Sequence, residues 1–377
     1  MVTGPGDIAV VEVTGTPRDR GRTQGEELRS LIADGVQRWE ERIHRRTGTP
    51  PAEYIDRFLE ASDFMPAVKR WAPDLLEEVR GIGEGANLPF KVAYAYQLMD
   101  EEWFFRFDYV RSRSGGSEHC STLAVYGEGG PPILAQNMDL PKTYDGTQTL
   151  LRVRYPDGLE SLVFTAAGLI GTTGLNNQAI GICVNSISQL GYRLQGLPVS
   201  FVIRRVLEFR SWHEATTFVQ TIPHASAQNM AVGGPEQVAD FECAPQGVVE
   251  FMPGQKRIYH TNHPLMHENQ PLAGHGVLSL SFGKGSESED GHDAKPLSDS
   301  EQRFLFLERG LQDESEVVTI DRVKALLSDC SVPVSVPRAS AGEGVTLGSL
   351  IMQLGRNPVL YLAPGPPSET AYRRWTF

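Results

Sequence analysis

The hydrophobic pattern of this chain changes its period once, near residue 120. Before that point apolar residues recur at helical spacing, as in residues 28–36, and after it apolar and polar residues alternate, as in residues 151–155. Two later segments return to helical spacing, residues 200–221 and a helix that begins near Asp299. A helical block followed by many strands, with two helices between them, predicts an α+β layer architecture.

Cys120 stands at the point where the period changes. The polar run 113–118 precedes it, and it occupies the first position of an apolar alternating segment. A thiol used for packing usually sits inside an apolar run, whereas a loop-to-strand junction can present a side chain to a substrate. Since a cysteine thiolate is a good nucleophile for acyl transfer, we expect Cys120 to be the reactive residue, with a structural cysteine as the alternative.

Residues 91–109 are rich in apolar and aromatic side chains. We interpret them as a helix packed on all sides, with an aromatic substrate cage as the alternative. The acidic run Asp100-Glu-Glu102 lies within this helix, and a fully buried helix would not carry these carboxylates unpaired. The run therefore favours some role for this helix at the functional site.

The balance of charged residues restricts the partners of the protein. The chain has 377 residues, 40% of them apolar and 22% charged, which is typical of a globular protein with a sizeable core. Its net charge of -12 would repel a nucleic-acid backbone or an anionic membrane, so we expect neither as a partner. No apolar run reaches the roughly 18 residues of a membrane helix, and residues 1–7 contain no secretory signal. We therefore expect a soluble, cytoplasmic protein.

The other three cysteines are Cys183, Cys243 and Cys330. Four scattered cysteines are too few for a disulfide framework, and none forms a Cys-x-x-Cys pair that would indicate zinc or redox chemistry. A reducing compartment fits this pattern best. We expect these three thiols to lie in the core.

The stretch 120–139 resembles the acyl-coenzyme A:isopenicillin N acyltransferase family, which belongs to the N-terminal nucleophile (Ntn) hydrolases. The matching features are the cysteine, the Gly-rich turn 127–132 and the sequence Gln136-Asn-Met-Asp139. Gly21-Arg-Thr-Gln-Gly25 also matches a helix near the start of family members. The resemblance implies two antiparallel sheets face to face between helical layers, a four-layer αββα sandwich with a helical N-terminal pro-segment.

The resemblance also implies that a precursor cleaves itself on the amino side of Cys120. The bond between His119 and Cys120 would be the cleavage site, and a helical segment 1–119 and a catalytic domain 120–377 would be the two fragments. The new α-amino group of Cys120, with an unperturbed pKa of about 8, would serve as the base. Family precursors often have glycine before the nucleophile, and the His119 side chain would either crowd the scissile bond or carry a proton.

Asp139 and Asn137 close the matching stretch. A carboxylate near an ammonium group fixes its direction and charge, so we expect Asp139 to orient the new amine or the thiol. A solvated cap at the end of a strand is the alternative for Asp139. Asn137 precedes it by two residues on the same face of the strand and ranks below it, as an oxyanion or substrate-binding candidate.

The sequence His260-Thr-Asn262-His263 is a second match, because the family carries such a sequence at the end of a strand and uses the Asn amide as an oxyanion donor. Asn262 is the candidate here. An amide N–H suits this role because it donates to developing negative charge without changing its protonation state. As a rival, His260, His263 and His267 would bind a metal ion from one helical face, but Pro264 disfavours helix at His263.

Three further residues fall near positions of the family site. Asn185 lies on a strand near a family asparagine, with sheet-end capping as the alternative. Ser226 falls where family members have a serine before a core strand, and Arg338 roughly matches a family arginine, although a surface arginine fits equally well. All three are candidate oxyanion or substrate-binding residues.

Together these features predict a self-processing Ntn cysteine amidohydrolase or acyltransferase. Its substrate would be a small-molecule acyl amide or thioester, and its two fragments would stay associated. We expect no cofactor and no metal, with acyl-coenzyme A as a candidate co-substrate. Two other classes remain open: a metal-dependent hydrolase that uses the three histidines, and a non-enzymatic α+β binding protein.

Overall fold

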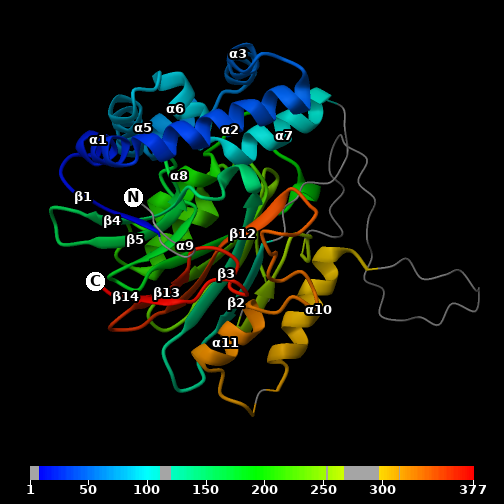
Figure 1. The fold of residues 1–377 in the computed structure, drawn as a ribbon. Coiled ribbons are helices and arrows are strands. Elements are labelled where there is room, and N and C mark those ends of the chain that lie inside the picture. Colours follow the sequence, from blue (N-terminus) through cyan, green and yellow to red (C-terminus); the bar gives the residue numbers. More distant parts are fainter. Residues whose placement is uncertain (1–7, 111–119, 252–253, 267–296, 314) are drawn as a thin grey trace, which may run out of the picture.

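Two β-sheets packed face to face form the centre of the protein (Figure 1). The computed structural model describes residues 8–110, 120–251, 254–266, 297–313 and 315–377. The larger sheet contains, in spatial order, β1 (Ala9–Val13), β4 (Gln148–Arg154), β5 (Glu160–Ala166), β6 (Thr173–Asn176), β7 (Gly181–Ser186), β8 (Gln228–Gly233), β9 (Val238–Ala244) and β10 (Gly247–Glu250). The smaller sheet contains β11 (Arg257–His260), β2 (Ser121–Val125), β3 (Ile133–Pro141), β12 (Gly344–Gln353), β13 (Val359–Ala363) and β14 (Arg373–Trp375).

Helices cover the outer faces of both sheets. On the larger sheet, α8 (Val199–Val206) and α9 (Trp212–Thr221) contact β7, β8 and β9. On the smaller sheet, α10 (Asp299–Leu311) and α11 (Ile320–Leu327) contact β11, β2, β3 and β12. Because each sheet has a helical layer on one face and the other sheet on the opposite face, most strands are buried on both sides. The predicted four-layer αββα sandwich is confirmed.

Glycine allows close packing between the two sheets at Gly348. A Cβ atom at Gly348 on β12 would lie 2.3 Å from the ring of Phe164 on β5. Any side chain at this position would therefore force the two sheets apart.

The N-terminal segment forms a helical layer at the top of Figure 1. It contains α1 (Pro17–Glu27), α2 (Arg29–Thr47), α3 (Pro51–Ala61), α4 (Met65–Trp71), α5 (Pro73–Ala86), α6 (Phe90–Gln97) and α7 (Met99–Val110). The glycines of the Gly21-x-x-x-Gly25 sequence let α1 cross α5 at close range, since a Cβ atom at Gly21 would lie 1.8 Å from the carbonyl oxygen of Glu78. None of the helices in the described ranges is long and apolar enough to cross a membrane.

Strand β1 ties the N-terminal segment to the larger sheet. It pairs in parallel with β4, from Ala9 opposite Thr149 to Val13 opposite Val153, whereas all other neighbouring strands are antiparallel. The segment therefore contributes a strand to the sandwich in addition to its helices.

The helices differ from the sequence pattern in three places. Residues 200–221 form two helices, because Ser211 caps α9 and its hydroxyl accepts a hydrogen bond from the backbone N–H of Glu214 (3.3 Å). Residues 91–109 also fall on two helices, α6 and α7, on either side of Leu98. The pattern does not predict α11, whose 8 residues are too few for a clear helical period.

Candidate active site

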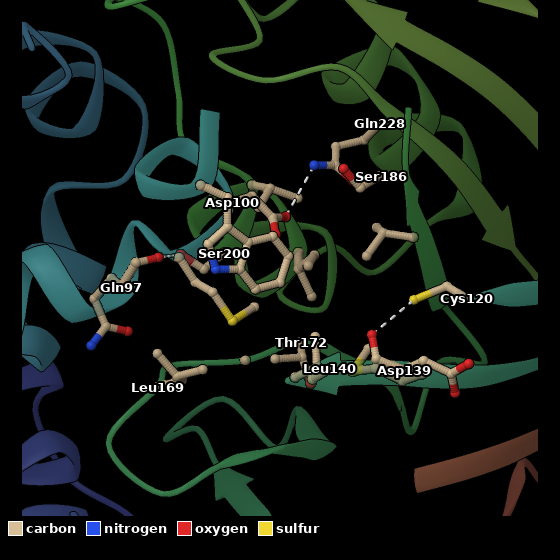
Figure 2. A pocket seen from close by; sticks show the side chains of 17 residues that line it. Gln97, Asp100, Cys120, Asp139, Leu140, Leu169, Thr172, Ser186, Ser200 and Gln228 are labelled. Carbon is tan, nitrogen blue, oxygen red and sulfur yellow. Dashed lines mark hydrogen bonds between the residues drawn. The ribbon is translucent and has the colours of Figure 1, made fainter. Parts of the chain in front are cut away.

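Cys120 lies directly before β2, where the inner faces of the two sheets meet the N-terminal helices. Its side chain is 8% exposed and lines a cavity of about 40 Å³ (Figure 2). The thiol donates to the backbone carbonyl oxygen of Asp139 on the neighbouring strand β3, at 3.7 Å. The thiol is therefore held at the cavity wall by its position in the sheet, as the junction in the sequence suggests. His119 lies outside the described residues.

Two side chains hold the backbone of Cys120. Its carbonyl oxygen accepts hydrogen bonds from Asn185 Nδ2 (3.2 Å) on β7 and from Arg303 Nη1 (2.6 Å) on α10. One donor comes from the larger sheet and the other from the helical layer on the smaller sheet, so the residue is held from two different layers. These hydrogen bonds hold the residue that directly precedes β2 without using its thiol.

Arg303 is a functional candidate that the sequence interpretation missed. Its guanidinium is fully buried and also donates to Ser121 Oγ (3.0 Å) and to Asn262 Oδ1 (3.1 Å). It thereby connects the cysteine to the amide of the predicted oxyanion residue. The sequence does contain an indication that Arg303 is buried. Arg303 precedes Leu307 and Leu311 at a spacing of four residues, so it lies on the apolar face of its helix.

Of the two predicted asparagines, Asn185 contacts the backbone of Cys120 directly, and Asn262 is connected to it through Arg303. Asn185 Nδ2 also donates to the carbonyl oxygen of His260 (3.0 Å), and its Oδ1 accepts from Thr122 Oγ1 (2.5 Å). Asn262 Nδ2 donates to the carbonyl oxygen of Ser186 (3.0 Å), a residue that lines the cavity. An amide nitrogen carries two protons, so this bond uses one of the two that Asn262 offers.

The carboxylate of Asp139 points away from the Cys120 thiol in Figure 2. Neither of its oxygens has a hydrogen-bond partner within the described residues, although Thr346 lies opposite on β12. Burial raises the pKa of Asp139 to about 7, while the Thr346 hydroxyl and the Arg303 guanidinium favour the charged form. A carboxyl with this pKa changes its protonation state near neutral pH.

We expect Asp139→Asn to reduce the pH dependence of stability. Because the folded-state pKa of about 7 exceeds the unfolded value of about 3.9, the proton stabilises the fold at low pH, and this contribution is lost as pH rises through 7. For wild type, this residue should lower the free energy of unfolding by about 2–3 kcal/mol between pH 5 and pH 8. Urea unfolding of both proteins at the two pH values measures the effect. If the free energy of unfolding changes equally between the two pH values in wild type and in Asp139→Asn, this prediction is wrong.

Asn137, Ser226 and Arg338 do not touch the cavity. Asn137 faces the outer helical layer and donates to the carbonyl oxygens of Leu327 (2.8 Å) and Val334 (2.7 Å). Ser226 lies behind the cavity wall, and Arg338 is about one-third exposed and pairs with acidic side chains at 3.0 and 3.2 Å. These contacts explain Asn137 by packing and Arg338 by surface ion pairs, while Ser226 bonds the acidic run of α7.

The histidines of the metal-site alternative have other partners. His260 Nε2 lies 3.1 Å from Glu242 Oε1, and its Nδ1 lies 2.8 Å from the carbonyl oxygen of Thr261. Burial lowers the pKa of His260, but Glu242 and Asp240 raise it more, so the net shift is upward. Among the described residues no three His, Cys, Asp or Glu side chains are grouped to hold a metal ion, and His267 lies outside that part of the chain.

The remaining cysteines differ from Cys120 in their surroundings. Cys183 and Cys243 are fully buried, and burial raises the pKa of both thiols. Both therefore behave as the predicted core residues. The prediction for Cys330 is wrong, because this thiol is exposed in the turn that follows α11.

The cavity beside Cys120 is mostly apolar. Its apolar lining comes from β3, β7, α8 and the N-terminal helices, and includes Met99, Met138, Leu140, Val184, Val199 and Ile203. The helix 99–110 also contributes Trp103 and Asp100, so the acidic run does reach the site. Such a cavity suits a compact apolar group attached to a reacting carbonyl.

Some solved structures resemble the chain at low similarity. A mutant of conjugated bile acid hydrolase from Clostridium perfringens is 13% identical with a TM-score of 0.41, and a second variant of that enzyme is 14% identical with a TM-score of 0.43; each match covers 68% of this chain and 97% of that one. Penicillin V acylase from Agrobacterium tumefaciens is 14% identical with a TM-score of 0.36, over 64% of this chain and 82% of that one. Sequence identities and TM-scores this low give no information about the substrate of this protein.

The family comparison gives a more specific result. No curated protein matches the sequence significantly. Residues 125–350, more than half of the chain, match the family of acyl-coenzyme A:6-aminopenicillanic acid acyl-transferase. The match begins just after Cys120 and contains every other described candidate residue. The chain therefore belongs to the acyl-coenzyme A:6-aminopenicillanic acid acyl-transferase family, as the stretch 120–139 indicates.

Proposed function

We propose that this protein is a self-processing Ntn cysteine amidohydrolase or acyltransferase that acts on a small-molecule acyl amide or thioester. One observation carries the proposal: the Cys120 thiol lines an apolar cavity while Asn185 and Arg303 hold the backbone of the same residue. A nucleophile needs this combination, because its backbone must stay fixed while its side chain reacts. Membership of an acyltransferase family supports the same chemistry.

Self-processing would begin with attack of the Cys120 sulfur on the carbonyl carbon of His119. The peptide nitrogen of Cys120 leaves as an amine and takes a proton, which produces a thioester. Water then cleaves the thioester, releasing the His119 carboxylate and regenerating the thiol. The hydrogen bonds from Asn185 and Arg303 to the Cys120 carbonyl oxygen would keep the new N-terminus in place after the peptide bond is cleaved.

In the processed enzyme, the Cys120 amine accepts the thiol proton and the thiolate attacks the acyl carbon of the substrate. The amine then returns the proton to the leaving nitrogen, or a thiolate leaves if the substrate is a thioester. Asn262 and backbone N–H groups would donate to the oxyanion. Water or an acceptor amine takes the acyl group in the second half of the reaction, and acyl-coenzyme A is a candidate acyl donor.

The two fragments of such a reaction would stay associated. Strand β1 pairs with β4, and the side chain of Gln97 donates to the carbonyl oxygen of Gly168 (2.7 Å) and accepts from the N–H of Ile170 (2.8 Å). Gln24 donates to the carbonyl oxygen of Leu169 (3.1 Å). The N-terminal helices also bury their apolar faces against the rest of the chain, so dissociation would expose a large apolar surface.

Intact mass combined with N-terminal sequencing tests the proposal. We expect two polypeptides that remain together on gel filtration, with the larger one beginning at Cys120. Iodoacetamide should abolish activity and a chelator should not, which distinguishes this enzyme from a metal-dependent hydrolase. A single 41.5 kDa polypeptide with no reactive thiol would contradict the proposal and favour a binding protein.

Asn262→Ala should lower kcat by roughly a hundredfold or more, because an oxyanion donor acts mainly in the transition state. Chain cleavage should still occur, since the thiol is retained. Steady-state kinetics with a chromogenic acyl amide measures the effect, and circular dichroism verifies the fold. A change confined to KM would instead assign Asn262 to substrate binding.

A further inference from the structure

Three residues that line the Cys120 cavity each have a polar side-chain atom with no hydrogen-bond partner among the residues that the structure describes. These atoms are Trp103 Nε1, Ser186 Oγ and Gln228 Oε1. The three side chains are 4%, 8% and 1% exposed, so bulk water does not solvate them. Buried polar groups are rarely left unpaired, and each one that is found needs an explanation. A ligand that enters the cavity would supply the missing partners.

The hydrogen bonds of Gln228 fix the orientation of its side-chain amide, and they leave the carbonyl oxygen as the atom without a described partner. Its amide nitrogen donates to Asp100 Oδ2 (3.0 Å) and to Ser226 Oγ (3.4 Å). Ser226 in turn donates to Glu101 Oε1 (2.7 Å), so its oxygen is available to accept from Gln228. Because a carboxylate can only accept, this network excludes the flipped amide. Asp100 and Ser226 accept from the Gln228 amide, and Glu101 accepts from Ser226. These residues of the network position the Gln228 side chain.

Ser186 and Gln228 lie side by side. They are directly opposite each other on the antiparallel strands β7 and β8, so their side chains share one face of the sheet. The backbone oxygen of Ser186 accepts from Asn262, which connects this pair to the cluster around Cys120. Trp103 faces the same cavity from α7 and offers only a donor.

We propose that Gln228, Ser186 and Trp103 form a polar subsite for the acyl group of the substrate, which carries an amide beyond the reacting carbonyl. The substrate N–H donates to Gln228 Oε1, and the substrate oxygen accepts from Trp103 Nε1 and Ser186 Oγ. This inference rests on the proposed function for the identity of the reacting bond. All cavity residues except Met99 are buried, and an acyl group stays attached to Cys120 after the leaving group departs, so a cavity lined by buried residues beside the thiol suits the acyl part.

A matched pair of substrates tests the subsite. N-acetylglycyl and 4-methylpentanoyl 4-nitroanilides have the same shape, but the second replaces the amide N–H and C=O by CH2 and CH(CH3). Wild-type enzyme should prefer the N-acetylglycyl substrate by at least about tenfold in kcat/KM, since the apolar analogue leaves the three atoms unpaired. Gln228→Met removes an acceptor with little change of shape, and Trp103→Phe removes a donor together with one ring. Each should reduce this preference at least about fivefold.

Gln148→Met is the matched control. Gln148 is also buried, but its amide donates to Asp145 Oδ1 (2.8 Å) and to the carbonyl oxygen of Leu347 (3.3 Å), away from the cavity. This variant should retain the wild-type preference even if it is less stable. An unchanged preference in both Gln228→Met and Trp103→Phe would overturn the subsite and assign the three atoms to bound water, for which the cavity has room.

Calorimetry separates this inference from the proposed function. Binding of N-acetylglycinamide and 4-methylpentanamide to wild type is measured without any chemical step. If the first binds more tightly but neither nitroanilide is hydrolysed, the subsite is supported and the proposed reaction fails. If both nitroanilides are hydrolysed with equal efficiency by wild type and the variants, the reaction is supported and the subsite fails.

Discussion

Cys120→Ala is expected to abolish both chain cleavage and acyl chemistry, the largest effect of any substitution in this protein. The sulfur is the nucleophile in each step, and no other described thiol lines the cavity. Stability should change by about 1 kcal/mol, because the substitution removes one sulfur atom and its long contact to the carbonyl oxygen of Asp139 while the β-carbon stays in place. The backbone contacts from Asn185 and Arg303 remain possible.

Intact mass and turnover of a chromogenic acyl amide measure the two activities of Cys120→Ala separately. Cys330→Ala is the matched control, since it removes an exposed thiol that does not line the cavity and should leave both activities unchanged. Cys120→Ser should retain partial cleavage, because a hydroxyl is a weaker nucleophile in the same position. Normal turnover by the alanine variant would mean that Cys120 is a structural residue.

Arg303→Met is expected to have the second largest effect, lowering kcat/KM by about a thousandfold and stability by about 2–4 kcal/mol. The guanidinium donates to Cys120 O, Ser121 Oγ and Asn262 Oδ1 at once. Its loss removes the donor to Ser121 Oγ and Asn262 Oδ1 and leaves the Cys120 carbonyl oxygen with Asn185 alone, so both the nucleophile and the oxyanion residue are held less firmly. The kinetic loss should therefore exceed that of Asn262→Ala.

Arg257→Met provides a matched control for Arg303→Met. Arg257 is also buried, and its guanidinium donates to the backbone oxygens of Leu311 (2.6 Å), Asp313 (2.6 Å) and Glu316 (2.7 Å), outside the Cys120 cavity. It should lower the free energy of unfolding measured in urea while kcat/KM of the folded enzyme stays at the wild-type value. Equal kcat/KM for Arg303→Met and Arg257→Met would show that Arg303 acts only on stability.

The site was partly predictable because some of its members lie close together in the chain. Cys120 and Asp139 lie at matching ends of the adjacent strands β2 and β3, so a pattern of alternating residues around one turn brings them together. Asn137 was predicted by the same reasoning, and it does share a strand face with Asp139. That face is turned toward α11 and away from the cavity, which the alternation alone could not reveal.

Arg303, Gln228 and Trp103 illustrate the part that the sequence did not reveal. Each lies more than a hundred residues from at least one of the other two, and they come from α10, β8 and α7. Their local patterns are those of ordinary buried positions. Only the polar contacts made after packing distinguish them from core residues, such as the bonds from Arg303 to Cys120 and from Gln228 to Asp100.

The sequence by itself determined the helical block before residue 120, the strands after it, the position of Cys120 at the start of a strand and the glycine spacing of the first helix. These features depend on hydrophobic period and on glycine, which are properties of neighbouring residues. The tertiary structure decided which face of β3 lines the cavity, that β1 joins the larger sheet, and that Arg303 bonds both Cys120 and Asn262. Such contacts depend on strand register and on the packing of four layers, and residues far apart in the chain meet only after those layers have formed.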